Sequence, residues 1–431
     1  MSNDARSQPA GGPGGPGGPG GPGGPGGPGG PRRGRFASER LDRLRRMLSG
    51  YVERDVLPGL VALVARQGEV HVFTAGALAA GGPAPMRRDT IFRIASLTKP
   101  VTAVGAMQLV EEATLRLDDP VDRWLPELAD RRVLRAVDGP LADTVPAARP
   151  ISVRDLLTLR LGLGAVMISP SAYPIQHAMD AAQVAPSPDQ PTIPPDEYLR
   201  RCGALPLAYQ PGVVWMYHTG IDLLGVLLAR ASGRPLGDLL RERIFEPLGM
   251  RDTGFCVPEA DVDRLATAYR PDPERGGLAV YDAAAGGRFT RPPVFEAGGS
   301  GLVSTVDDYF VFLQMLLDGG SHGGRRILSR PSVELMTTDQ LTPGQKAASD
   351  FVPGFWDAHG WGLGLAVDTR RVDLSTVPGR FGWDGGYGTS GYADPKEGLV
   401  GVLLTQRMMD SAAGTEVARD FWTMAYAAID D

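Results

Sequence analysis

Residues 92–99 of the chain read Phe92-Arg93-Ile94-Ala95-Ser96-Leu97-Thr98-Lys99. This stretch contains an S-x-x-K pattern, in which a serine and a lysine stand three residues apart. Positions i and i+3 lie on one face of a helix, so the amine of Lys99 can reach the hydroxyl of Ser96. An apolar helix is expected over about 98–112, and its N-terminus would supply free backbone N–H groups beneath Ser96. These features favour an alkoxide and the oxyanion of a tetrahedral intermediate. Taken alone, the pattern also fits a serine and a lysine on a helix surface.

A tyrosine stands just before a second predicted helix, in the segment Pro211-Gly212-Val213-Val214-Trp215-Met216-Tyr217-His218-Thr219. A phenol can act as a general base if a nearby cation lowers its pKa from the ordinary value of about 10. Lys99 would be that cation. Without such a neighbour, Tyr217 would be a packed aromatic residue with a satisfied hydroxyl.

A glycine-rich run precedes one of the strand-like segments near the C-terminus and reads Gly382-Trp383-Asp384-Gly385-Gly386-Tyr387-Gly388-Thr389. Glycines let the backbone approach a ligand closely. The edge of the strand could therefore supply a second N–H group to an oxyanion. A plain β-turn is the alternative.

The N-terminal part of the chain changes character near residue 36. Residues 11–31 are seven tandem Gly-Gly-Pro triplets, which cannot form a packed core, so a disordered tether is expected over 1–35. Apolar residues recur at helical spacing from about residue 38. Runs at 60–66 and 70–75 then predict a β-hairpin.

The remainder of the chain predicts two kinds of structure. Residues 115–285 read as helices and long loops, including a long surface loop over 166–197. Strand-like runs follow near the C-terminus, at 362–367, 387–393 and 399–405, and a final helix at about 415–429. We therefore expect an α/β subdomain built from 36–114 and 286–431, with a helical subdomain inserted over 115–285.

Composition excludes several classes of function. The 431 residues are 42% hydrophobic and 22% charged, with a formal net charge of -6. That charge argues against nucleic acid or an anionic membrane surface as a partner. The chain has no apolar run long enough for a transmembrane helix and no apolar leader, so a cytoplasmic protein is expected. The two cysteines, Cys202 and Cys256, form neither a metal-binding motif nor a disulfide framework.

Together the three motifs resemble the class C β-lactamase and penicillin-recognising superfamily, and especially its family VIII carboxylesterases. The resemblance spans about residues 38–430 and rests on the order and spacing of further segments. These are Pro58-Gly59-Leu60-Val61, Leu115-Arg116-Leu117-Asp118-Asp119-Pro120-Val121, Ile151-Ser152-Val153-Arg154-Asp155-Leu156-Leu157-Thr158, Pro247-Leu248-Gly249-Met250 and Gly298-Gly299-Ser300-Gly301-Leu302-Val303-Ser304-Thr305.

The resemblance implies a fold and a set of roles. The fold would be α/β (α+β), β-lactamase/transpeptidase-like, with an antiparallel sheet flanked by helices and an inserted, mainly helical subdomain. Ser96 would be the acylated nucleophile, Lys99 would hold or take its proton, and Tyr217 would be the catalytic tyrosine of the Y-x-N motif. The N–H groups of Ser96 and Gly386 would form the oxyanion hole. The resemblance implies no metal and no cofactor.

The chain departs from the family pattern at the substrate-binding positions. Thr219 replaces the asparagine of Y-x-N. Trp383-Asp384-Gly385 occupies the K-T-G position, so an aromatic ring replaces a lysine that helps to bind the substrate carboxylate in the β-lactamases. Asp384 beside the site would repel anionic substrates. These changes favour a neutral, partly apolar ester over a β-lactam. His218, next to Tyr217, could also touch the site.

Three alternatives compete with this interpretation. The sequence has five histidines but no G-x-S-x-G elbow, which argues against a Ser-His-Asp hydrolase, and it has no H-E-x-x-H metal motif. A non-catalytic binding protein with a decayed site would not be expected to keep Ser96, Lys99 and Tyr217 together. We therefore expect a serine hydrolase that acts on small-molecule esters or amides through an acyl-enzyme. An acyltransferase using the same intermediate, a β-lactamase or a D,D-peptidase are the alternative enzymes, and the oligomeric state is left open.

Overall fold

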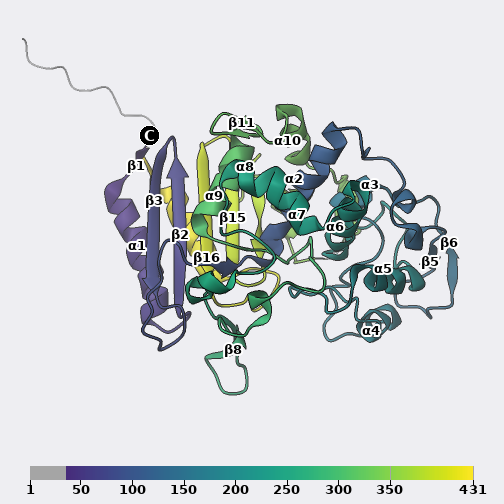
Figure 1. Ribbon diagram of the computed structural model, residues 1–431, viewed down its shortest axis with the longest axis horizontal. Helices are drawn as coiled ribbons and strands as arrows, with labels where there is room; N and C mark the ends of the chain where they lie inside the picture. Colours follow the sequence, from purple (N-terminus) through teal and green to yellow (C-terminus); the bar gives the residue numbers. More distant parts are fainter. Residues whose placement is uncertain (1–34, 350, 431) are drawn as a thin grey trace, which may run out of the picture.

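The computed structural model describes residues 35–349 and 351–430. Its centre is a seven-stranded antiparallel sheet with the strand order β12-β13-β14-β15-β16-β2-β3 (Figure 1). The strands are β2 (Gly59–Arg66), β3 (Glu69–Gly76), β12 (His359–Trp361), β13 (Ala366–Asp368), β14 (Phe381–Gly385), β15 (Thr389–Asp394) and β16 (Leu399–Thr405). The sheet thus joins a segment near the start of the described chain to one near its end.

The predicted β-hairpin is confirmed as β2 and β3, which pair from Gly59–Gly76 to Arg66–Glu69. Both turn residues, Gln67 and Gly68, have positive φ, as the two-residue turns of tight hairpins require. All eight residues of β2 are buried because the strand is covered on both faces. The strand predicted at 362–367 is confirmed only at its end, because Ala366 and Val367 belong to β13, whereas residues 362–365 form the turn of a second hairpin between β12 and β13.

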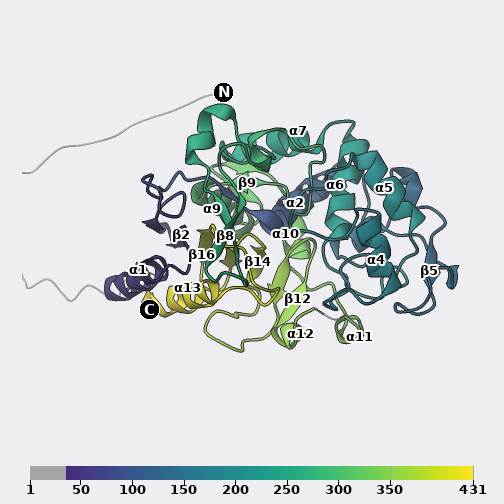
Figure 2. The same cartoon turned by 90° about the horizontal axis from the view of Figure 1, so that it is seen from below.

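Helices cover both faces of the sheet, so the expected antiparallel sheet flanked by helices is confirmed. One face carries α1 (Ser38–Glu53) and α13 (Glu416–Ala427), which lie side by side, and the other carries α2 (Thr98–Glu111) and α9 (Val306–Leu317) (Figure 2). The buried side of α1 is made by Leu41, Leu44, Leu48 and Tyr51, at the helical spacing seen in the sequence.

A group of mainly helical elements lies beside the sheet, at the right of Figure 1. Its helices include α3 (Val153–Leu157), α4 (Pro174–Ala181), α5 (Pro195–Ala204) and α6 (Thr219–Ser232). The prediction of an unstructured loop over 166–197 is wrong in part, because α4 lies within it and buries Ile175 and Met179. The alanines and prolines of this stretch conceal the helical period.

Shorter elements complete the described chain. The remaining α-helices are α7 (Leu236–Leu240), α8 (Glu246–Leu248), α10 (Arg330–Met336), α11 (Pro343–Ala347) and α12 (Phe355–Ala358). The two-stranded pairs are β1 (Arg35–Phe36) with β17 (Ile429–Asp430), β4 (Phe92–Arg93) with β9 (Val303–Ser304), β5 (Arg132–Leu134) with β6 (Thr144–Pro146), β7 (Ala268–Pro271) with β8 (Leu278–Asp282), and β10 (Ser321–His322) with β11 (Arg325–Arg326).

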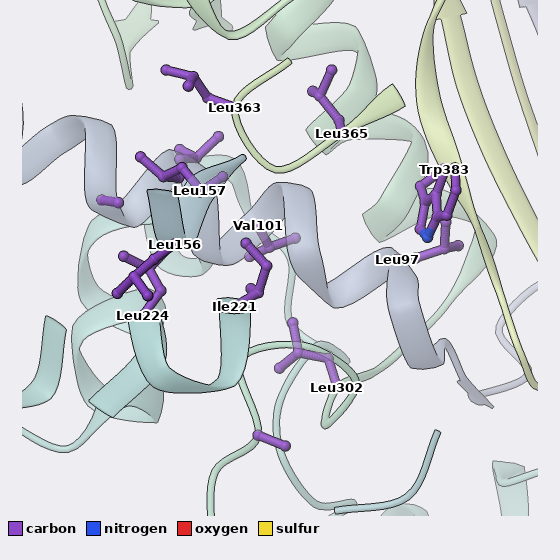
Figure 3. Packing of buried hydrophobic residues seen from close by; sticks show 14 of the residues in the cluster. Leu97, Val101, Leu156, Leu157, Ile221, Leu224, Leu302, Leu363, Leu365 and Trp383 are labelled. Atoms are coloured by element: carbon purple, nitrogen blue, oxygen red, sulfur yellow. The ribbon is translucent and has the colours of Figure 1, made fainter. Parts of the chain in front are cut away.

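The core that positions the site lies around α2. Figure 3 shows Leu97 and Val101 of this segment among side chains from α3, α6, the β12–β13 turn and β14, the last represented by Trp383. Because α2 is buried along most of its length, the residues at its start are held by packing from several elements.

Two predictions concern the ends and the boundaries of the fold. The expected tether over 1–35 lies, apart from Arg35, outside the described residues, and the subdomain boundaries at 114 and 286 stay predictions. No helix of the described chain is long and apolar enough to cross a membrane.

Candidate active site

Ser96 lies in a single 3-10 turn, Ala95–Leu97, that leads directly into α2. Ala95 before it has φ of 44°, a left-handed backbone conformation that costs energy for a residue with a Cβ atom. The hydroxyl of Thr98 donates to the Ala95 carbonyl at 2.6 Å and so braces this turn. Ser96 is 5% exposed and lines a cavity of about 670 Å³.

The Lys99 amine is fully buried and lies against Ser96. Its Nζ atom is 2.9 Å from Ser96 Oγ, 2.7 Å from the carbonyl oxygen of Gly299 and 3.2 Å from Nδ1 of His218. Burial lowers the pKa of Lys99 to about 7, and the carboxylate of Asp222 opposes this change. Near neutral pH the amine is therefore present in both its neutral and its charged form.

Tyr217 lies beside both groups, but its ring, not its hydroxyl, faces the lysine. Lys99 Nζ is 4.5 Å from the centre of the ring, and the hydroxyl accepts a hydrogen bond from Trp383 Nε1 at 2.7 Å. Burial raises the pKa of Tyr217, although the neighbouring Ser96 and Trp383 side chains oppose this change. The expected lowering of this pKa by Lys99 is therefore wrong, because burial of the phenol raises the pKa instead.

His218 lines the cavity beside Tyr217, as the sequence suggested, and connects Lys99 to Asp222. Nε2 of His218 is 3.0 Å from Oδ2 of Asp222, one helical turn away at the start of α6. The other carboxylate oxygen of Asp222 accepts the backbone N–H of Gly299 at 2.8 Å. Sequence reasoning missed Asp222, although its i,i+4 spacing from His218 was visible. Thr219 is fully buried at the first position of α6 and does not line the cavity.

The glycine-rich run is itself a strand, β14, followed by a tight turn, and does not merely precede a strand. Gly385 lies where a Cβ atom would come within 2.3 Å of the Ile94 carbonyl, so only glycine lets β14 approach the turn that carries Ser96. Gly386 follows the strand and lines the cavity. Neither Ser96 nor Gly386 donates its backbone N–H to another described residue.

Trp383 and Asp384 point to opposite faces of the sheet because side chains alternate along a strand. Trp383 bonds to Tyr217 on the face that carries Ser96. Asp384 accepts a hydrogen bond from Tyr392 at 3.0 Å on the other face, and burial raises its pKa. The carboxyl therefore lies across the strand from Ser96, not beside it as the sequence suggested.

The cavity has an aromatic wall around Ser96 and extends past the edge of β14 to the face that carries α13. Its lining includes the side chains of Tyr217, Phe351, Phe355 and Trp383 near the serine. Farther away it is lined by Arg380, Asp384 and Tyr392, and by Trp422 of α13 itself. A substrate with a large apolar group fits such a lining better than a small, charged one.

One wall of the cavity is formed by a segment between α4 and α5 that is held in place by hydrogen bonds. Pro186, Ser187 and Pro188 line the cavity. The next residue, Asp189, accepts hydrogen bonds from the hydroxyls of Tyr281 at 2.5 Å and Tyr387 at 2.8 Å. Sequence reasoning gave this segment a part in shaping the site but could not identify Asp189, whose partners are distant in sequence.

No group of three or more His, Cys, Asp or Glu side chains among residues 35–349 and 351–430 is arranged to hold a metal ion. The groups gathered around Ser96 are its own hydroxyl, an amine of lowered pKa, a phenol of raised pKa and two backbone N–H groups that are free within the described chain.

Comparison with known proteins gives consistent results. The family model described as Beta-lactamase matches residues 44–420. Protein Rv1367c of Mycobacterium tuberculosis is 42% identical over 339 residues, which cover 78% of this chain and 82% of the relative. Esterase EstB of Burkholderia gladioli is 32% identical over 381 residues, covering 83% and 88%. The solved structure of EstCE1, a hydrolase with promiscuous acyltransferase activity, aligns with a TM-score of 0.71 and 26% identity over 91% of this chain and 98% of its own.

Proposed function

The chain belongs to the beta-lactamase family and is a serine hydrolase with a β-lactamase/transpeptidase-like fold, and we propose that it hydrolyses neutral carboxylic esters through an acyl-enzyme formed on Ser96. The observation that carries the proposal is the contact of 2.9 Å between the hydroxyl of Ser96, which lines the cavity, and the buried Lys99 amine. An amine with a pKa of about 7 is neutral in a large fraction of molecules near neutral pH and can accept a proton there.

Acylation follows from this contact. The neutral Lys99 amine takes the proton of Ser96 as Oγ forms a bond to the ester carbonyl carbon, and the carbonyl oxygen becomes an oxyanion. The free N–H groups of Ser96 and Gly386 are the donors proposed to hold that oxyanion. When the intermediate collapses, the bond to the alcohol oxygen breaks and the alcohol leaves with a proton. Water then attacks the acyl carbon, the bond from that carbon to Ser96 Oγ breaks, and the acid is released.

Tyr217 is proposed to deliver the proton to the leaving alcohol. Its raised pKa keeps the phenol neutral at the pH of the reaction. Its oxygen already accepts from Trp383, so its own O–H group is free to donate. In deacylation the phenolate takes a proton from the attacking water, and the Lys99 ammonium returns its proton to Ser96 Oγ, so both groups regain their starting forms. In acylation, this role replaces the general-base role expected from the sequence.

The cavity supports the substrate class. Trp383 places an aromatic side chain where β-lactamases carry a cation, and Phe351 and Phe355 extend the apolar wall. Two of the similar proteins are described as an esterase and a hydrolase. A small-molecule ester with a bulky apolar group, without a carboxylate next to the reacting carbonyl, is the substrate that this lining favours.

Acyl transfer is the second candidate. A cavity of about 670 Å³ that passes round the edge of β14 has room for an acyl group and an alcohol acceptor together. Hydrolysis and transfer share the acyl-enzyme and differ only in whether water or the alcohol attacks it.

The test compares wild type with Ser96→Ala on p-nitrophenyl esters of increasing acyl length. We expect Ser96→Ala to lose at least ~10³-fold in rate while its circular dichroism spectrum is unchanged. Ser187→Ala, which changes another serine at the cavity wall, is the matched control and should keep most of the rate. Retention of the rate by Ser96→Ala would refute the proposed function.

A further inference from the structure

Four groups behind Ser96 form a closed ring of hydrogen bonds. Lys99 Nζ contacts Nδ1 of His218 at 3.2 Å, Nε2 of His218 contacts Asp222 at 3.0 Å, Asp222 accepts from the Gly299 N–H at 2.8 Å, and the Gly299 carbonyl accepts from Lys99 at 2.7 Å. The three side chains are 0%, 3% and 2% exposed, in the order Lys99, His218 and Asp222. Water therefore has little part in fixing their proton positions.

The ring fixes the tautomer of His218. The ionised carboxylate of Asp222 can only accept hydrogen bonds, so the proton of the imidazole must sit on Nε2. Nδ1 then carries a lone pair, and this lone pair faces Lys99. Burial and the neighbouring Lys99 charge both lower the pKa of His218, which favours this neutral form.

A neutral amine has two N–H bonds and one lone pair. At Lys99 the Gly299 carbonyl accepts one N–H and His218 Nδ1 accepts the other, so the lone pair is left to face Ser96 Oγ. We propose that His218, held in the Nε2–H tautomer by Asp222, is a positioning residue that aims the lone pair of Lys99 at the Ser96 hydroxyl. This inference rests on the proposed function of Ser96 and Lys99.

The acceptors around Lys99 also suit the charged amine. When the Ser96 proton moves to Nζ, the ammonium has three N–H bonds, and Ser96 Oγ, His218 Nδ1 and the Gly299 carbonyl accept one each. The proton therefore arrives and leaves without rotation of the amine, which keeps the reorganisation of the site small.

The backbone at His218 supports a role for its side chain. Its φ of 86° and ψ of −64° are strained for any residue with a Cβ atom and are easily adopted only by glycine. This bend brings the neighbouring residues 217 and 218 to the same amine, whereas consecutive side chains of a strand point apart. The fold keeps a histidine at a position where glycine would relieve the strain.

The first test is chemical rescue of His218→Gly. Glycine accepts the local backbone conformation, so the variant should fold, and it leaves a space for imidazole. With an alkyl ester as substrate, we expect kcat to fall by about 10²-fold with KM little changed, and added imidazole to restore a large part of kcat. N-methylimidazole has no N–H group that Asp222 could accept, so it should not restore kcat. Ser96→Ala/His218→Gly is the control and should show no imidazole-dependent turnover.

The second test is Asp222→Asn. The amide oxygen can still accept from Gly299, but its NH2 group now donates to Nε2, so the proton of His218 moves to Nδ1 and faces Lys99. The titratable groups of the described chain packed against this amine are His218, Asp222 and Tyr217. We expect kcat to fall by about 10²-fold. The acid limb of the pH–rate profile should move to lower pH, because Asp222 no longer stabilises the ammonium.

The outcomes separate this inference from the proposed function. If Ser96→Ala is inactive while both other variants keep wild-type kcat, or if N-methylimidazole rescues as well as imidazole, the positioning role of His218 is wrong and the acyl-enzyme stands. If Ser96→Ala remains active, the proposed function fails first.

Discussion

Burial has opposite consequences for the two titratable groups that contact the reacting serine. The charged form of an amine is the protonated one, so desolvation lowers the pKa of Lys99 to about 7. The charged form of a phenol is the deprotonated one, so desolvation raises the pKa of Tyr217. The same apolar packing therefore favours the neutral amine and the neutral phenol, the two forms that the proposed mechanism needs.

This difference predicts a pH dependence for wild type. A protonated Lys99 has no lone pair, so kcat/KM for a neutral ester should fall as the pH drops through about 7 and reach a plateau above it. The measurement is the initial rate across about pH 5 to 9, with fluorescence-monitored folding at each pH. A profile without a limb near neutrality, in a range where the protein stays folded, would remove Lys99 as the base.

The conservative change Tyr217→Phe tests the phenol. Removing the hydroxyl takes away the proposed proton donor but leaves the ring against Lys99, so kcat should fall by about 10²–10³-fold. The acid limb should stay near its wild-type position, because it belongs to Lys99. Loss of the acid limb together with the rate would instead show that Tyr217 carries the titration, and the lysine would then not be the base.

At this scale the sequence predicted what depends on local spacing. Ser96 and Lys99 are one helical turn apart, so their contact follows from three residues of separation. The pKa of Tyr217 cannot be predicted from local spacing, because the residues that desolvate its ring, such as Phe351 and Trp383, are far away in sequence. The role of Asp222 does not follow from a motif either: its partner His218 precedes the first residue of α6 and contacts the carboxylate one helical turn further on.

At the scale of elements, the segment between α4 and α5 is a fixed wall. Asp189 receives the hydroxyls of Tyr281 and Tyr387 and forms an ion pair with Arg288 at 2.7 Å. These bonds hold the preceding residues 186–188 against the cavity, where Pro188 lies close to Gly386. The shape of the substrate pocket thus depends on a carboxylate that does not touch the reaction.

Asp189→Ala should loosen this wall. Three partners lose a common acceptor, so we expect KM for a bulky ester to rise by about tenfold with a smaller change in kcat, and amide hydrogen exchange over 182–194 to speed up. Asp180→Ala, at an exposed position of the same region, is the matched control. Unchanged KM and unchanged exchange would show that the wall is held by other contacts.

The elements themselves were predicted unevenly. The helix that follows Ser96 was expected over 98–112 and is observed as α2 over Thr98–Glu111, because its apolar run is long and starts at a clear motif. The short helix α4 and the strand β14 were missed. In α4, prolines hide the helical period of the apolar residues. In β14, Gly385 allows a close approach to Ile94, and no local sequence pattern reveals that contact.

At the scale of the whole molecule, the site lies where three distant parts of the chain meet. Ser96 and Lys99 come from residues 95–99, the Tyr217–Asp222 group from the start of α6, and Gly386 from the end of β14. Pairing of β16 with β2 joins the late part of the sheet to its early part. The sequence predicted that both parts share one sheet, but not the strand order, because order depends on long-range pairing that no motif encodes.

The central claim is that the hydroxyl at position 96 is acylated during turnover. Intact-mass spectrometry after rapid acid quench of the enzyme with a slowly turned-over ester tests it most directly, with peptide mapping of the product. We predict one added acyl mass on the peptide that contains Ser96, and none on Ser96→Ala. An acyl group on another residue, or turnover of the ester by Ser96→Ala, would contradict the account.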